Sequence, residues 1–252
     1  MNLNLKGRKA IVTGGTRGIG RAIVDLLADE GCDVAFCARN PEQIAAAVKA
    51  IEAKGVKAHG AVVDVSAEGA VAGFVESAAK ALGGADIFVS NVSGAMGLNN
   101  DPAAWKTAVE TDILRTVEGC EAAAGLLTEG GSIVVIGTIS AIEVSGPRRP
   151  YSAVKAALLP YVKNLARDLA PKNIRANVVA PGPIYFEGGV WDMIEKHMPD
   201  RFNATLARSP LGRLGKPEEI ANAAVFLASP RASYITGINM ICDGAVTQRV
   251  DF

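Results

Sequence analysis

Histidine and cysteine are scarce in this sequence of 252 residues, and neither is grouped in the way that a metal site requires. There are two histidines and four cysteines, and Cys32, Cys37, Cys120 and Cys242 lie apart in apolar segments. Because no Cys-x-x-Cys pair or Cys/His cluster occurs, we expect neither a metal site nor a disulfide framework. The cysteines are expected to be reduced and buried, since cysteine often behaves as a small hydrophobic residue. Any proton transfer must use another side chain.

An excess of charge and a long apolar run are also lacking. Lysine plus arginine and aspartate plus glutamate number 26 each, so no net field would draw the protein to nucleic acid or to an anionic membrane. No apolar run approaches the roughly 18 residues that a membrane span needs. The first residues, MNLNLKGRKAIV, lack the apolar stretch of a signal peptide. We expect a cytoplasmic protein that recognises its partners locally.

Short runs rich in β-branched residues alternate with longer alanine-rich segments of helical period. These runs lie at residues 9–15, 33–39, 56–65, 85–91, 131–137, 174–182 and 237–245. Each is apolar on both faces, as a strand covered by helices above and below must be. The alternation predicts one α/β domain over residues 1–252, a Rossmann-type doubly wound parallel sheet of about seven strands. Residues 183–212 interrupt it and are expected to form a helical insertion, either a substrate lid or a plain surface hairpin.

A glycine-rich turn follows the first expected strand. Gly14, Gly18 and Gly20 have the spacing Gly-x-x-x-Gly-x-Gly and lead directly into a helical segment. Glycines at this point let a pyrophosphate approach the positive end of the helix, which predicts a dinucleotide site. The residues of the turn expected to bind the cofactor are Gly14, Thr16, Arg17, Gly18, Ile19 and Gly20.

The end of the second expected strand indicates which dinucleotide binds. A cofactor with a free ribose 2′-hydroxyl favours an acidic residue there, but Ala38 and Arg39 occupy the position. Arg17 and Arg39 could converge on a 2′-phosphate, which predicts NADP(H); the alternative is that both are solvated surface arginines. Asp64, after the third expected strand, is expected either to contact the adenine or to cap the next turn.

Tyr151 and Lys155 lie four residues apart in the segment YSAVK, so on a helix they share one face. Apolar residues of the same period follow, which marks the face as inward and makes a lysine there costly unless it is used. A nearby ammonium favours the ionised form of a phenol, and oxidised nicotinamide would add a second positive charge. Tyr151 is therefore predicted to be the general acid/base, and no histidine is needed.

Five further motifs follow the glycine turn in order: VVDV, SNVSG, YSAVK, VVAPG and CDGA. In order and spacing the set resembles the short-chain dehydrogenase/reductases over essentially the whole chain. The segment GRLGKPEEIANAAVFLASPRASYITG is similar to the 3-oxoacyl-(acyl-carrier-protein) reductases and their relatives. The resemblance implies that Tyr151 is the acid/base, that Lys155 supports it and holds the nicotinamide ribose, and that the protein is a homotetramer. It also implies cofactor contacts by Asp64, Val65, Asn91, Pro181, Gly182 and Ile184.

The substrate-binding hydroxyl departs from the family pattern. The family has a serine thirteen residues before the tyrosine, and Thr138 stands there in this sequence. A threonine hydroxyl offers the same donor and acceptor, so Thr138 is predicted to bind the substrate oxygen. Ser140, two residues later, is the second candidate. Two smaller departures are Ser93 in place of a glycine and Phe186 in place of a threonine that contacts the carboxamide.

Asp112 stands where the family has an asparagine in a proton relay to the lysine. With a helical period, Asp112 shares a face with Trp105, Val109 and Thr116, so it is expected to point inward with them. An unpaired buried carboxylate is costly, which predicts contact with Lys155 directly or through water. The alternative is a register in which Asp112 is solvated.

The sequence thus predicts an NADP(H)-dependent oxidoreductase that transfers a hydride between nicotinamide and a carbonyl/alcohol substrate. Tyr151, Lys155, Thr138 and Asp112 are its catalytic candidates, and Thr138, Ser140 and Tyr151 its substrate contacts. Two alternatives stay open: a polyol, sugar or steroid alcohol dehydrogenase that uses the same residues, and an NADP(H)-binding regulatory or structural protein with a silent site.

Overall fold

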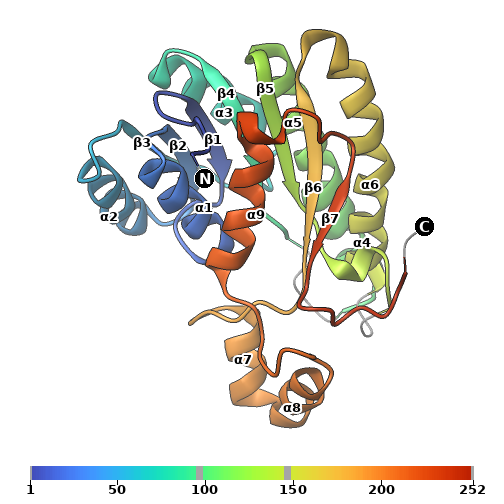
Figure 1. Ribbon diagram of the computed structural model, residues 1–252. Helices are drawn as coiled ribbons and strands as arrows, with labels where there is room; N and C mark the ends of the chain where they lie inside the picture. Colours follow the sequence, from blue (N-terminus) through green and yellow to red (C-terminus); the bar gives the residue numbers. More distant parts are fainter. Residues whose placement is uncertain (1, 95–98, 145–148, 251–252) are drawn as a thin grey trace.

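A seven-stranded parallel sheet forms the centre of the molecule (Figure 1). The computed structural model describes residues 2–94, 99–144 and 149–250. The strand order is β3-β2-β1-β4-β5-β6-β7, which confirms the expected doubly wound sheet. The strands are β1 (Lys9–Thr13), β2 (Asp33–Ala38), β3 (Ala58–Val62), β4 (Ala85–Ser90), β5 (Leu127–Ile136), β6 (Arg175–Pro181) and β7 (Asn239–Cys242).

Helices cover both faces of the sheet (Figure 1). They are α1 (Gly18–Asp29), α2 (Pro41–Glu52), α3 (Ala70–Leu82), α4 (Pro102–Ala108), α5 (Arg115–Leu126), α6 (Arg149–Leu169), α7 (Val190–His197), α8 (Pro199–Ala207) and α9 (Pro217–Ala228). Helices α1, α2 and α9 pack in the apolar core on one face, and α3, α5 and α6 pack in the core on the other. Because the inner strands β1, β2, β4, β5 and β6 are largely buried, polar side chains gather beyond the strand ends.

The chain reverses its direction of winding between β1 and β4. Strand β1 pairs with β2 on one side and with β4 on the other. In open parallel sheets, a crevice forms outside the carboxyl ends of the strands at such a switch point. The fold therefore positions a site where the glycine turn follows β1.

A π-helical segment, Val109–Leu114, separates α4 from α5 and corrects one prediction. The side chains of Trp105 and Val109 are each 38% exposed, whereas Asp112 and Thr116 are 0% and 3% exposed. The prediction that all four share an inward face is wrong. A π-turn contains more residues than an α-turn, so it rotates the residues that follow it relative to those that precede it.

Helices α7 and α8 lie beyond the carboxyl ends of the strands, at the bottom of Figure 1. They fall within the stretch 183–212 that interrupts the strand-helix alternation, so helices do form there. Within the described ranges, none of the helices has both the length and the apolar character of a membrane span.

Arg175, the first residue of β6, caps the C-terminus of α9. Its guanidinium is buried and donates hydrogen bonds to the backbone oxygens of Leu227, Ala228 and Ser229. The last carbonyls of a helix lack partners within the helix, and a cation there also interacts favourably with the helix dipole. Burial lowers the pKa of Arg175 to about 10, so the side chain stays charged at neutral pH.

We expect Arg175→Met to lower the free energy of unfolding by about 2–4 kcal/mol, because several buried carbonyls would lose a charged donor. Urea denaturation of wild type and variant measures the change. Arg167→Met, at an exposed position of α6, is the control and should differ from wild type by less than about 0.5 kcal/mol. Equal midpoints and slopes for wild type and Arg175→Met would contradict the capping role.

Candidate active site

The turn between β1 and α1 leaves no room for a side chain at Gly14 or at Gly20. Gly14 has a φ of +73°, and a Cβ added at Gly20 would lie 2.0 Å from the Gly14 backbone oxygen. No described side chain caps the N-terminus of α1. An open helix N-terminus next to a bare backbone attracts phosphate, so these residues fit the pyrophosphate of a dinucleotide.

The ring of Phe186 covers the start of α1. A Cβ added at Gly18 would lie 2.5 Å from the ring, and one added at Gly189 would lie 2.9 Å from it. The ring therefore packs between two glycines. Arg17 Nη1 also donates to the Gly188 backbone oxygen at 3.4 Å. The segment after β6 thus packs against the glycine turn, whereas the sequence indicated only a missing threonine at position 186.

Asp192 holds this segment against α7. Its carboxylate accepts hydrogen bonds from the Tyr185 hydroxyl at 3.2 Å, the Gly188 N–H at 3.0 Å and the Lys196 ammonium at 2.9 Å. The Lys196 ammonium and the Gly188 N–H lower the pKa of the Asp192 carboxyl. The loop that carries Phe186 is therefore fixed from the α7 side as well as by its contact with the glycine turn.

The ends of β2 and β3 bring charged side chains to the same region. Arg39 and Arg17 are exposed and both line the cavity described below. Asp64 accepts hydrogen bonds from the backbone N–H and the hydroxyl of Ser66, at 3.0 and 2.7 Å. These bonds, and more weakly the charge of Arg39, lower the pKa of the Asp64 carboxyl. Asp64 thus caps the turn after β3, which was one of its two expected roles.

Asn91 follows β4 and joins that strand to the glycine turn. Its amide nitrogen donates to the backbone oxygens of Thr13 and Gly14, at 3.1 and 3.2 Å. Its backbone N–H donates to the Thr13 hydroxyl at 2.9 Å. The carboxyl ends of β1 and β4 are therefore held together at the switch point.

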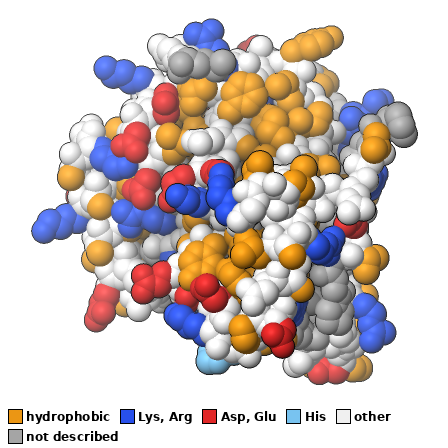
Figure 2. Space-filling view, turned by 60° about the horizontal axis from the view of Figure 1, so that its bottom comes forward, with side chains coloured by type: hydrophobic (Ala, Val, Ile, Leu, Met, Phe, Trp, Pro, Cys, Tyr) orange, Lys and Arg blue, Asp and Glu red, His pale blue; other side chains and the backbone are white. Residues whose placement is uncertain are grey.

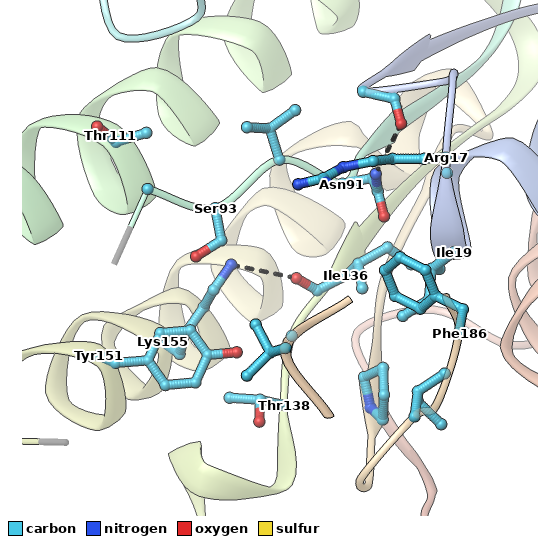
Figure 3. A pocket seen from close by; sticks show the side chains of 18 of the residues that line it. Arg17, Ile19, Asn91, Ser93, Thr111, Ile136, Thr138, Tyr151, Lys155 and Phe186 are labelled. Carbon is cyan, nitrogen blue, oxygen red and sulfur yellow. Dashed lines mark hydrogen bonds between the residues drawn. The ribbon is translucent and has the colours of Figure 1, made fainter. Parts of the chain in front are cut away.

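Lys155 and Asp112 form a buried ion pair. Lys155 Nζ lies 3.2 Å from Asp112 Oδ1, and the two side chains are 3% and 0% exposed. The ammonium also donates to the Ile136 backbone oxygen at 3.3 Å (Figure 3), and Asp112 Oδ2 accepts from the Gly94 N–H at 3.1 Å. A buried charge requires both an opposite charge and further hydrogen bonds, and each partner here has both. The expected direct contact is confirmed, and the solvated alternative for Asp112 is excluded.

Tyr151 lies one turn before Lys155 on α6, and its half-buried side chain lines the cavity. Thr138 follows β5 and is 8% exposed. Its hydroxyl oxygen accepts a hydrogen bond from the Ser140 N–H at 3.2 Å. Figure 3 shows the side chains of Tyr151 and Thr138 on the same side of the cavity. Ser140 lines the cavity as well, so the choice between the two hydroxyls as the substrate-binding group stays a prediction.

One cavity of about 790 Å³ connects these features. No histidine is among the described residues of its wall. Of the predicted site residues, Gly18 and Asp112 do not line it: the Phe186 ring covers Gly18, and Asp112 is fully buried. The predicted residues that do line it are Gly14, Thr16, Arg17, Ile19, Gly20, Arg39, Asp64, Val65, Asn91, Thr138, Ser140, Tyr151, Lys155, Pro181, Gly182 and Ile184.

Some residues of the wall were missed by the sequence reasoning. Helix α8 and its C-terminal end contribute Arg201, Thr205 and Arg208. Their spacing of four and three residues is that of one helical face, so the sequence pattern could have indicated that they lie together. Ser93 also lines the cavity, and its buried hydroxyl oxygen has no hydrogen-bond partner in the described part of the chain. No sequence pattern reveals such an unpaired atom.

Proteins of known sequence resemble this chain over nearly its full length. The family model described as enoyl-(acyl carrier protein) reductase matches residues 14–247. Isoepoxydon dehydrogenase of Penicillium expansum is 36% identical over 98% of this chain and 97% of its own length. A 3-oxoacyl-(acyl-carrier-protein) reductase of Chlamydia pneumoniae is 33% identical over 98% of this chain and 100% of its own length.

Solved structures share the fold. A short-chain dehydrogenase from Burkholderia cenocepacia J2315, in complex with NADP, has a TM-score of 0.89 at 32% identity and covers 96% of this chain and 98% of its own. A blue fluorescent protein from a metagenomic library, in complex with NADPH, has a TM-score of 0.86 at 32% identity and covers 97% and 99%. Together with the strand order and the glycine turn, these likenesses show that the chain belongs to the short-chain dehydrogenase/reductase family of oxidoreductases.

Proposed function

We propose that the protein transfers a hydride between NADP(H) and a carbonyl/alcohol substrate, with Tyr151 as general acid/base. One observation carries the proposal: a single cavity joins the glycine turn to Tyr151, Lys155 and Thr138. A dehydrogenase and a 3-oxoacyl reductase among the relatives support a carbonyl/alcohol pair as the reacting group. NADP and NADPH in the structural neighbours support the choice of cofactor.

The residues of the turn and of the strand ends would hold the dinucleotide. The N-terminus of α1 and the bare backbone at Gly14 and Gly20 would bind the pyrophosphate. Arg17 and Arg39 would bind the 2′-phosphate with charge-assisted hydrogen bonds. Asp64 and Val65 would contact the adenine, and Pro181, Gly182 and Ile184 the nicotinamide. When bound, the reduced cofactor supplies the hydride.

The chain's own residues then handle the proton and the substrate oxygen. Thr138 donates a hydrogen bond to the carbonyl oxygen and orients it beside the Tyr151 hydroxyl, with Ser140 as the second candidate for this role. The Tyr151 hydroxyl gives its proton to that oxygen as the carbonyl carbon accepts the hydride, which leaves a phenolate and an alcohol. The Lys155 ammonium stabilises the phenolate, and a proton from solvent restores the hydroxyl.

Asp112 would position Lys155 and moderate its charge. The carboxylate is 3.2 Å from the ammonium, so the ion pair joins Lys155 of α6 to the π-helical segment. Because a carboxylate partly cancels the positive charge, the phenolate of Tyr151 receives less stabilisation than it would from an unpaired lysine. Asp112 is thus a positioning residue, since the cofactor and substrate do not reach it.

The segment 183–212, with α7 and α8, would act as a lid of one catalytic domain that comprises residues 1–252. Its contacts with the glycine turn, through Phe186 and Arg17, support this role. A homo-oligomer, with four subunits by analogy with the family, is also proposed. Four exposed apolar side chains support an interface along the helices from α4 to α5: Trp105, Val109, Leu114 and Leu126.

Removing the Tyr151 hydroxyl should stop turnover. Tyr151→Phe is expected to lower kcat by at least about 100-fold, the range of general acid/base catalysis, while the Kd of NADPH changes little. NADPH consumption with ketones and aldehydes measures the rate, and cofactor fluorescence measures binding. Tyr161→Phe is the control, because the Tyr161 hydroxyl bonds to Glu121 outside the cavity. Full activity of Tyr151→Phe would refute the role, and NADPH binding without turnover by wild type would favour a silent site.

The cofactor preference should depend on Arg39. We expect wild type to use NADPH with a higher kcat/KM than NADH, and Arg39→Ala to lower the NADPH value by about tenfold or more, because a charge-assisted bond to the 2′-phosphate is lost. The NADH value should change much less. Steady-state kinetics with both cofactors give the ratio, with Arg167→Ala as the control. Comparable kcat/KM values for both cofactors in wild type would contradict the NADP(H) assignment.

Replacing Asp112 by asparagine should change the pH dependence of alcohol oxidation. The amide keeps an acceptor for the Gly94 N–H but removes the charge beside Lys155, so the base form of the site should appear at lower pH. The rising limb of kcat/KM against pH is then expected to move to lower pH. Asp168→Asn, at an exposed position of α6, should leave the profile in place. An unchanged pH profile in Asp112→Asn would contradict an electrostatic effect of Asp112 on the pair of Lys155 and Tyr151.

A further inference from the structure

Helix α8 turns a polar face toward the cavity. Arg201, Thr205 and Arg208 all line the cavity wall. Residues separated by four and by three positions lie on one side of a helix, so the three side chains form a continuous stripe. The proposed hydride transfer gives no role to this stripe.

The two arginines of the stripe differ in whether a carboxylate lies beside them. Arg208 Nη2 lies 3.2 Å from Glu143 Oε1, and Glu143 also accepts a hydrogen bond from the Gln248 N–H at 3.1 Å. Arg201 is half-buried and has no carboxylate within ion-pair distance in the described part of the chain. Within the described residues, the positive charge of Arg201 therefore has no ion-pair partner, whereas that of Arg208 has one.

The described residues of the cavity wall supply little negative charge to balance Arg201. Val190, Trp191 and Val246 belong to the same cavity wall and are apolar. Among the described lining residues the single carboxylate is Asp64, which follows β3 and already bonds to Ser66. Figure 2, which turns the bottom of Figure 1 toward the viewer, shows arginine and lysine side chains next to apolar ones on this face. A cavity in which positive charges outnumber negative ones raises the local concentration of anions.

We propose that the substrate carries an anionic group, a carboxylate or a phosphate, which Arg201 binds. The inference rests on the proposed function, because it assigns the substrate class of the same cavity. A guanidinium presents its donors in a planar fork that matches both anions. Charge recognition at α8 would then orient the reacting carbonyl at Tyr151.

Matched pairs of carbonyl compounds test the proposal. The carboxylate arm uses acetoacetate and levulinate, each against its methyl ester, and the phosphate arm uses dihydroxyacetone phosphate against dihydroxyacetone. In each pair the reacting group is a ketone in the same chain position, and one member carries an anionic group that the other lacks. We expect wild type with NADPH to reduce the charged member of at least one pair with a kcat/KM about tenfold or more above its neutral partner. The arm that responds identifies the anion.

Three variants locate the preference. Arg201→Gln should reduce the charged-to-neutral ratio by about tenfold, because it removes the uncompensated charge. Arg208→Gln should reduce the ratio less, since Glu143 already neutralises Arg208. Arg167→Gln, an arginine on the exposed part of α6, should not change it. Equal NADPH affinity in all variants establishes that each is folded.

The outcomes separate this inference from the function on which it rests. Reduction of neutral ketones with no preference for any charged member, or a ratio unchanged in Arg201→Gln, overturns the anion site and leaves hydride transfer standing. No turnover of any compound overturns the proposed function. In that case the Kd of levulinate and of dihydroxyacetone phosphate for the NADPH-loaded protein decides: weaker binding to Arg201→Gln supports the anion site, and equal binding overturns it.

Discussion

The buried pair of Lys155 and Asp112 connects the parts of the structure on which the active site depends. Through it α6 is joined to the π-helical segment, and the additional bonds to Ile136 and Gly94 reach β5 and the loop after β4. Two buried charges are stable only when each meets the other and also has polar neighbours. These four segments therefore have one mutual arrangement, and that arrangement also fixes the position of Lys155 in the cavity wall.

The parallel sheet explains why the polar groups meet at one edge. Its strands are covered by helices on both faces, so charge is excluded from the interior except where it is paired, as at Lys155, or caps a helix, as at Arg175. The turns beyond the carboxyl ends carry the remaining polar groups. The wall of the resulting cavity carries cations from several segments, among them Arg17, Arg39 and Arg201, together with the hydroxyls of Thr138 and Tyr151.

Local patterns in the sequence were enough to predict the strands, the glycine turn, the pairing of Tyr151 with Lys155 on one helix and the burial of Asp112. Each depends on spacing or on the cost of burying charge. The inward face assigned to Trp105 and Val109 was wrong, because a period of 3.6 residues does not hold across a π-turn. The packing of Phe186 on Gly18 was not predictable, since those residues are far apart in the sequence and meet only in the folded chain.

The contact of one aromatic ring with two glycines restricts which residues can occupy these three positions in related sequences. The ring of Phe186 fills space that exists only because Gly18 and Gly189 have no Cβ, and each missing atom would lie within 3 Å of the ring. A relative with a small residue in place of Phe186 is free to lose Gly189, whereas a relative that keeps the phenyl group must keep both glycines. These three positions should therefore covary among homologues and mark the relatives in which the loop after β6 packs on the glycine turn in this way.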